Sequence, residues 1–230
     1  MNLLAIDTAT EACSVALSSH GQVLEHYQLA PMRHAELVLP MIDAVLAEAG
    51  LHKQQIDAIA VGKGPGAFTG VRLAISVAQG IALGLDLPVL GISSLAALAQ
   101  DLAGVADDAM VLACMDARMG EVYAGVYRRG ADGLMALVGS ESVGPVSALG
   151  LPDSARWVVV GSGWGSYAAA LTALIGAPAL ADAERYPRAA MIARLAVPGF
   201  QRGEGLAPEL VLPSYLRDKV ALTSAERIVA

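Results

Sequence analysis

The feature that most constrains the fold is a short element that occurs twice in the chain. Near the N-terminus the apolar run Leu4-Ala5-Ile6-Asp7 ends in an aspartate, and a turn and a second apolar segment follow. The same order recurs at Ala113-Cys114-Met115-Asp116, before a tight turn and an expected strand over residues 121–127. An internal repeat indicates that one supersecondary unit has been used twice. The sequence therefore predicts two similar lobes that face each other.

The pattern between and after the repeats alternates strands with helices, which is typical of an α/β protein. Expected strands cover residues 3–7, 13–19, 23–29, 56–62, 88–92, 110–116, 121–127 and 157–161, and expected helices cover residues 34–49, 71–85, 93–102 and 167–175. A further helix and loop are expected within residues 185–205, with Pro198 marking an end. The best domain boundary is residues 104–108. We expect an N-terminal lobe of residues 1–103, a C-terminal lobe of residues 104–213, and a tail, residues 214–230, that packs back on the first lobe.

Composition and charge narrow the classes of function. With 55% hydrophobic and 16% charged residues, the chain can bury enough surface to fold. Its net charge is -7, and nucleic-acid affinity comes largely from neutralising phosphates, so we expect this chain to hold RNA only through a partner. Cys13 and Cys114 are read as buried free thiols of a reducing compartment. No secretory signal or membrane span is visible, so a cytosolic protein is expected.

The glycine loop at residues 62–70 allows two interpretations. Its backbone N–H groups and the following helix N-terminus suit an anion, with Gly64 and Gly66 as candidate contacts. No Gly-Lys-Ser/Thr closes the loop, so it is not a P-loop. The alternative is tight packing against the sheet. Asp7 with Thr8 likewise fits either a hydrated metal beside a nucleotide phosphate or a turn capped by its own carboxylate. The same choice applies to Asp116.

The sequence contains few residues in arrangements that are typical of catalytic or metal sites. The four histidines show no i, i+4 pairing, and neither cysteine has a nearby histidine. We therefore predict no catalytic residue, no metal site and no cofactor, with weak ADP or ATP binding as the open possibility. The helix at residues 71–85 is apolar nearly all round. A helix of that kind is expected to be buried by its own sheet on one side and by a partner on the other.

Four motifs together resemble the bacterial TsaB (YeaZ) family: Ile6-Asp7-Thr8-Ala9-Thr10, Gly64 to Arg72, Met115 to Tyr123, and Pro213-Ser214-Tyr215-Leu216-Arg217. The resemblance implies the actin-like fold of sugar kinases and Hsp70-type ATPases, with two ribonuclease-H-like lobes. It also implies a role in making N6-threonylcarbamoyladenosine at position 37 of tRNAs that read codons beginning with A. In that pathway the related protein TsaD transfers the threonylcarbamoyl group, and TsaB supports it without catalysing the transfer.

The resemblance also implies partners and a surface. It implies a heterodimer with TsaD, a larger assembly with the ATPase TsaE, and a homodimer when the chain is alone. The interface would be a bundle of the two helices after the meander and after the glycine loop, with the residues Leu37, Met41, Ala44, Val45, Leu73, Ser76, Val77 and Gly80. The alternative is that these residues pack only on their own sheet. An aspartate at Val45 or Val77 is expected to abolish pairing and to leave the monomer folded.

Two positions argue against catalysis within this family. The His-x-x-x-His metal pair of TsaD-like proteins falls by spacing near Ser93 and Ala97, and neither residue can hold a metal. The adenosine-binding turn of the catalytic relative falls at residues 161–165, where Trp164 adds bulk. The rival hypothesis is an enzyme of the same fold, either a metallopeptidase or an ATP-hydrolysing protein.

Overall fold

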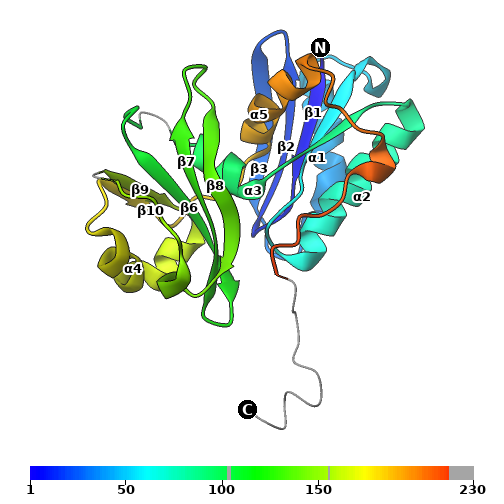
Figure 1. Ribbon diagram of the computed structural model, residues 1–230. Helices are drawn as coiled ribbons and strands as arrows, with labels where there is room; N and C mark the ends of the chain where they lie inside the picture. The colour runs from blue at the N-terminus through cyan, green and yellow to red at the C-terminus, as the bar shows by residue number, and fades with distance from the viewer. Residues whose placement is uncertain (103–104, 155, 218–230) are drawn as a thin grey trace.

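The computed structural model describes residues 1–102, 105–154 and 156–217, which form two lobes side by side (Figure 1). The first sheet has the order β3-β2-β1-β4-β5 and the second has the order β8-β7-β6-β9-β10. The bounds are Leu3–Asp7 for β1, Ala12–Ser19 for β2, Gln22–Leu29 for β3, Ala58–Gly62 for β4, Val89–Ile92 for β5, Met110–Arg118 for β6, Glu121–Arg129 for β7, Met135–Gly144 for β8, Trp157–Val160 for β9 and Leu180–Asp182 for β10.

The two sheets repeat one connectivity. In each, the first three strands form an antiparallel meander, and the next two strands lie parallel to the first on its other side. β1 corresponds to β6 in this scheme, so the two strand–aspartate–turn elements occupy the same place in the two lobes. The predicted duplication is confirmed. The strands β8 and β10 were not among the expected elements.

Helices cover both faces of each sheet. α1 (His34–Glu48) and α2 (Phe68–Leu85) pack on one face of the first sheet, in a core with Leu4, Ile6 and Val15. α4 (Ser162–Ile175) covers the outer face of the second sheet. Ser93 caps α3 (Ser94–Gln100), as predicted, because its Oγ accepts hydrogen bonds from the backbone N–H groups of Leu95 and Ala96.

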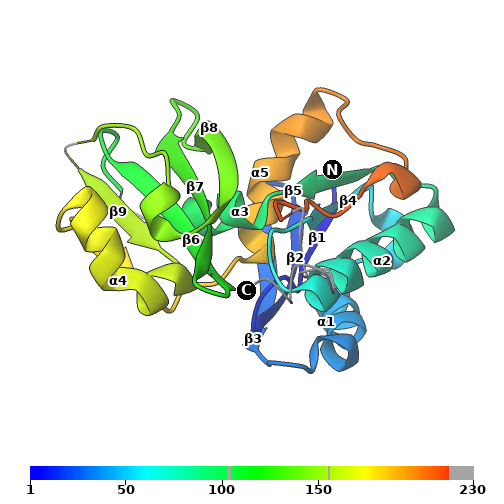
Figure 2. The ribbon, with the colours of Figure 1, turned by 60° about the horizontal axis from the view of Figure 1, so that its bottom comes forward.

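The remaining two helices are exchanged between the lobes. α3 follows the last strand of the first sheet but packs on β6, β7 and β8, whereas α5 (Ala189–Gln201) follows β10 and packs on β1, β2 and β4. Figure 2 shows α3 and α5 together at the junction of the lobes. The expected lobes of residues 1–103 and 104–213 thus each contain one helix, α3 and α5 respectively, that packs on the sheet of the other lobe. The small side chains of Ala189, Ala193 and Ala196 allow α5 to lie close against the first sheet.

Two further expectations concern Pro198 and the C-terminal tail. Pro198 lies inside α5 and does not end it, since the helix continues to Gln201. A proline removes the bond to the carbonyl four residues earlier, here that of the exposed Arg194. Of the expected tail, Ser214 packs on the first lobe, where its N–H donates to the carbonyl of Lys63 at 2.8 Å. Residues 218–230 lie outside the described residues.

α2 is long and apolar enough to cross a membrane by length and composition, the only such helix among the described residues. Its residues Val71, Ala74, Ile75 and Ala78 are buried in the core of the first lobe. A core helix of a soluble protein passes the same test.

Candidate functional site

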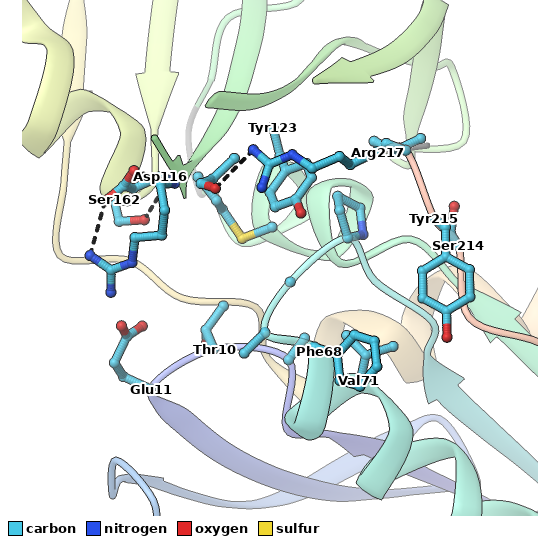
Figure 3. A pocket seen from close by; sticks show the side chains of 18 of the residues that line it. Thr10, Glu11, Phe68, Val71, Asp116, Tyr123, Ser162, Ser214, Tyr215 and Arg217 are labelled. Atoms are coloured by element: carbon cyan, nitrogen blue, oxygen red, sulfur yellow. Dashed lines mark hydrogen bonds and ion pairs between the residues drawn. The ribbon is translucent and has the colours of Figure 1, made fainter. Parts of the chain in front are cut away.

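A cavity of about 640 Å³ lies between the lobes. In the first lobe its walls come from the turn after β1, the segment that leads into α1, and the glycine loop with the start of α2. In the second lobe they come from the end of β6, Tyr123 of β7 and the start of α4, and the chain segment Ser214 to Arg217 completes them. Figure 3 shows Asp116, Ser162 and Tyr123 on one side of this cleft and Thr10, Phe68 and Val71 on the other. The two copies of the repeated element therefore meet at one place.

Both repeated aspartates cap their own turns. Oδ1 of Asp7 accepts a hydrogen bond from the N–H of Ala9 at 2.9 Å, and Oδ1 of Asp116 accepts one from the N–H of Arg118 at 2.8 Å. This is the turn interpretation of the sequence, at the same i to i+2 spacing in each lobe. Asp116 also pairs with the Arg118 guanidinium at 3.2 Å. Its carboxylate thus has a cationic partner within its own turn.

Asp7 and Thr8 lie behind the cavity wall. Both are fully buried, and neither lines the cavity. The Thr8 hydroxyl donates to the carbonyl of Gly70 at 2.6 Å. Burial raises the pKa of Asp7 to about 7, although hydrogen bonds from Ala9 and Ser94 act in the opposite direction. In this arrangement neither candidate reaches a ligand in the cleft, and their role is to join β1 to α2 and α3.

The glycines of the loop serve close packing. A Cβ on Gly66 would lie 2.4 Å from the carbonyl oxygen of Ala9, and one on Gly70 would lie 2.0 Å from that of Thr8. The N–H of Ala67 donates to the same Ala9 carbonyl at 2.7 Å, so this donor is not free for an anion. Gly64 is buried with φ +93°, a conformation that favours glycine. Of the two interpretations, packing accounts for these glycines.

The second lobe repeats this packing at the turn after β9. A Cβ on Gly161 would lie 2.3 Å from the carbonyl oxygen of Cys114, and one on Gly163 would lie 2.9 Å from its sulfur. Trp164 packs against the core below α4. At the position expected for a metal pair, Ser93 caps α3 and donates to Glu141, and Ala97 is fully buried.

The two arginines that line the cleft already have partners. Arg118 pairs with Asp116, and Arg217 pairs with Glu121 and donates to the carbonyl of Ala117. Both cysteines are buried away from the cavity. Burial raises the pKa of Cys13 to about 11 and that of Cys114 to about 12, so neither is a thiolate near neutral pH. Within the described ranges no three His, Cys, Asp or Glu side chains gather as metal ligands.

A second candidate surface is the outer face of α2. We call it the α2 flank and define it by Leu73, Ser76, Val77, Gly80, Leu83 and Gly84, which are all exposed or half-buried. A Cβ added to Gly80 or Gly84 would meet nothing within 4 Å. Leu83 is 65% exposed and was not among the expected residues, although it lies one turn beyond Gly80 on the same side.

The expected residues of α1 divide between surface and core. Leu37 and Ala44 are half-buried. Met41 is only 9% exposed and Val45 is not exposed at all, because both point into the core under α1. Met41 and Val45 therefore belong to the core of the first lobe in this conformation. The apolar pattern of α1 could not separate these two groups.

Two five-stranded sheets of one connectivity, joined by exchanged helices around a cleft, define a protein of the actin-like class with two ribonuclease-H-like lobes. The TsaD family model, tRNA N6-adenosine threonylcarbamoyltransferase, matches residues 26–224. The Escherichia coli protein named tRNA threonylcarbamoyladenosine biosynthesis protein TsaB is 41% identical over 96% of both chains. The Haemophilus influenzae protein of the same name is 51% identical over 54% of this chain and 52% of its own.

The solved structures agree with these relatives. YeaZ from Pseudomonas aeruginosa superposes with a TM-score of 0.87 at 47% identity, covering 94% of this chain and 99% of its own. A second structure from that organism, described as similar to the peptidase YeaZ, matches at 46% identity with the same coverage and TM-score. The chain belongs to the TsaB (YeaZ) family, whose members are named for tRNA threonylcarbamoyladenosine biosynthesis.

Proposed function

We propose that the protein is a non-catalytic subunit for N6-threonylcarbamoyladenosine modification at position 37 of tRNAs that read codons beginning with A. It binds and supports the transferase TsaD as a heterodimer, and the ATPase TsaE joins the larger assembly. Alone it pairs with a second copy of itself. It acts in the cytoplasm and contacts tRNA only through the complex. The observation that carries this proposal is the α2 flank, an apolar helix face with glycine at its centre.

The shape of the α2 flank favours a helical partner. Gly80 and Gly84 leave a shallow strip along the exposed side of the helix, and Leu73, Val77 and Leu83 border it. Small residues between larger apolar ones allow another helix to approach closely and to bury the leucines. α1, which contacts α2, adds the half-buried Leu37 and Ala44 as further candidate interface residues. A partner that presents a similar pair of helices would complete a four-helix contact.

The chemistry of the cleft supports a role without catalysis. Arg118 and Arg217 are paired with carboxylates of the chain itself, which reduces their attraction for a phosphate. The net charge of -7 also works against direct tRNA binding, because phosphate contacts dominate nucleic-acid affinity. A partner must therefore supply the positive surface that holds the tRNA.

The test is a substitution that fills the glycine strip. Gly80→Arg places a long side chain where nothing lies within 4 Å, so the monomer keeps its fold and the partner helix is pushed away. Ala169→Arg, on the exposed side of α4 in the second lobe, is the matched control. We expect Gly80→Arg to abolish co-elution with TsaD in size-exclusion chromatography and to stop modification in a reconstituted reaction. An intact complex with Gly80→Arg would overturn the choice of surface.

Omission experiments test the non-catalytic role. Reconstituted modification with each subunit left out in turn should fail without this chain and should also fail with this chain alone. Stoichiometric zinc or iron in the purified protein, together with protease activity, would instead support the rival metallopeptidase. Nucleotide hydrolysis by the purified chain would support an ATP-hydrolysing enzyme.

A further inference from the structure

The segment of residues 206–217, which we call the strap, is fixed along the first lobe. Leu206 and Val89 exchange two backbone hydrogen bonds of 2.9 Å. The side-chain amide of Gln79, on α2, donates to the carbonyls of Pro208 at 3.0 Å and Val211 at 3.2 Å. Val211 itself is buried in the core under α2. Figure 1 shows the strap in orange and red, passing beside α2.

The strap then crosses to the second lobe. The guanidinium of Arg72, in the second turn of α2, lies 3.1 Å from the ring centre of Phe68 and 5.0 Å from that of Tyr215. Two residues further, Nη2 of Arg217 donates to the carbonyl of Ala117 at 3.0 Å and to the carboxylate of Glu121. Ala117 lies at the end of β6 and Glu121 at the start of β7, on either side of the turn that joins these strands. In Figure 3 Arg217 lies beside Tyr123, across the cleft from Phe68 and Val71.

A second connection between the lobes is made by α3 and α5, which pack against each other. Ser93 and Gln100 hold α3 on the second lobe through Glu141 and the backbone of Gly133 and Met135. The hydroxyl of Ser94, also on α3, donates to Asp7 of the first lobe at 3.3 Å. Neither α3 nor α5 lines the cavity. The exchanged helices thus form a fixed junction, and Arg217 closes the chain across the cleft at a distance from it.

We propose that the strap is a latch that sets the opening of the cleft, with Arg217 as its movable end and the α3–α5 junction as its hinge. The ion pair with Glu121 is partly exposed, at 19% for Arg217 and 34% for Glu121, so it can be exchanged for water. The strap is held on α2 by Gln79 and Arg72, so a displacement of α2 reaches the second lobe through Arg217. The proposal does not depend on which partner binds α2.

The experiment measures the distance between the lobes in the full chain. Spin labels are attached at Asp43→Cys on α1 and Ala169→Cys on α4, both exposed, while the buried native cysteines stay unlabelled. Arg217→Ala should broaden the distance distribution and shift it to longer values. Arg202→Ala is the matched control, since Arg202 pairs with Glu204 on the surface of one lobe, and it should leave the distribution unchanged.

Two further variants decide the result if Arg217→Ala folds poorly. Glu121→Gln keeps a neutral acceptor and should broaden the distribution less than Arg217→Ala. The exchange Arg217→Glu with Glu121→Arg restores an ion pair across the cleft and should narrow the distribution again. Distributions identical to the parent chain in Arg217→Ala and Glu121→Gln would overturn the latch. So would a broadening that the charge exchange fails to reverse.

Discussion

The carboxylate of Glu25 on β3 accepts a hydrogen bond of 3.0 Å from the backbone N–H of Ala190, in the first turn of α5. It also accepts from Ser14 at 2.8 Å, and Ser14 accepts from the N–H of Ala189 at 2.9 Å. The first turn of α5 has no cap of its own, and the first sheet supplies one. Arg188, at the N-cap, completes the ion pair with Glu25.

We therefore predict that Glu25→Ala destabilises the protein by about 2 to 4 kcal/mol, because it removes a nearly buried cap and leaves Arg188 without its partner. Glu25→Gln should cost less, since its oxygen still accepts from Ala190. Urea unfolding followed by circular dichroism measures both. Glu36→Ala, which breaks an exposed pair with Arg33, is the control and should change stability by less than about 0.5 kcal/mol. Equal effects of Glu25→Ala and Glu36→Ala would contradict the capping role.

The buried Asp7 makes stability depend on pH. The folded pKa is about 7 and the unfolded value is 3.8, so between these values the unfolded chain loses a proton that the folded protein keeps. This contribution to stability is fully present below pH 4 and is lost as the pH rises to about 7. The loss amounts to at most about 4 kcal/mol.

Asp7→Asn should therefore raise stability at pH 8 and flatten the pH dependence between pH 4 and 7. The asparagine oxygen still accepts from Ala9, and its amide can donate to the Ser94 hydroxyl. Chemical denaturation at several pH values gives the curves. Parallel curves for the parent and the variant would show that Asp7 does not carry this dependence.

Alanine substitutions at the glycines of α2 and of the loop before it should change the stability of the protein in opposite directions. Gly66→Ala and Gly70→Ala bring a methyl group against the backbone of Ala9 and Thr8, and we expect a loss of about 2 kcal/mol or more for each. Gly80→Ala has free space and should gain about 0.5 to 1 kcal/mol from helix propensity. Melting temperatures compare the three. A stable Gly70→Ala protein would mean that the loop moves away from β1 easily.

Aspartate substitutions at Val45 and Val77 test which of these side chains lies in the core and which lies on the surface. The expectation that Val45→Asp leaves the monomer folded is corrected by the burial of this side chain. The substitution puts a carboxylate into the core under α1 and should cost about 3 kcal/mol or more, enough to unfold a large fraction of the protein. Val77→Asp lies on the half-buried edge of the α2 flank, so the monomer should stay folded while co-elution with TsaD is lost. Unfolding curves and size-exclusion chromatography distinguish the two effects. A well-folded Val45→Asp chain would contradict the burial of that side chain.

Local patterns predict much of this fold. The repeated strand and aspartate, the cap at Ser93 and the helix after the glycine loop all depend on neighbouring residues, and all are present. β8 was missed because its polar residues and glycines, such as Gly139 and Ser140, give little apolar alternation. β10 has only three residues. Neither length nor composition could reveal these two strands.

The site was harder to predict because it depends on contacts between distant segments. Sequence spacing places Asp7 after a strand, but only the packed structure shows that α5 and the glycine loop cover it. The exchange of α3 and α5 depends on which sheet face each helix fits. The contact of α5 with β1 joins segments that are nearly two hundred residues apart in the sequence. The motif Pro213 to Arg217 marks Arg217 in the sequence, but its contact with Glu121 depends on the path of the strap across the two lobes.

The exchanged helices also affect how the chain is made. β1, β2 and β4 leave the ribosome early, but α5, which covers one of their faces, ends at Gln201. During translation this face of the first sheet therefore stays uncovered until more than a hundred further residues have been synthesised. A fragment ending near residue 103 would keep this bare face permanently and should aggregate. The gene therefore encodes one folding unit, despite the visible duplication within it.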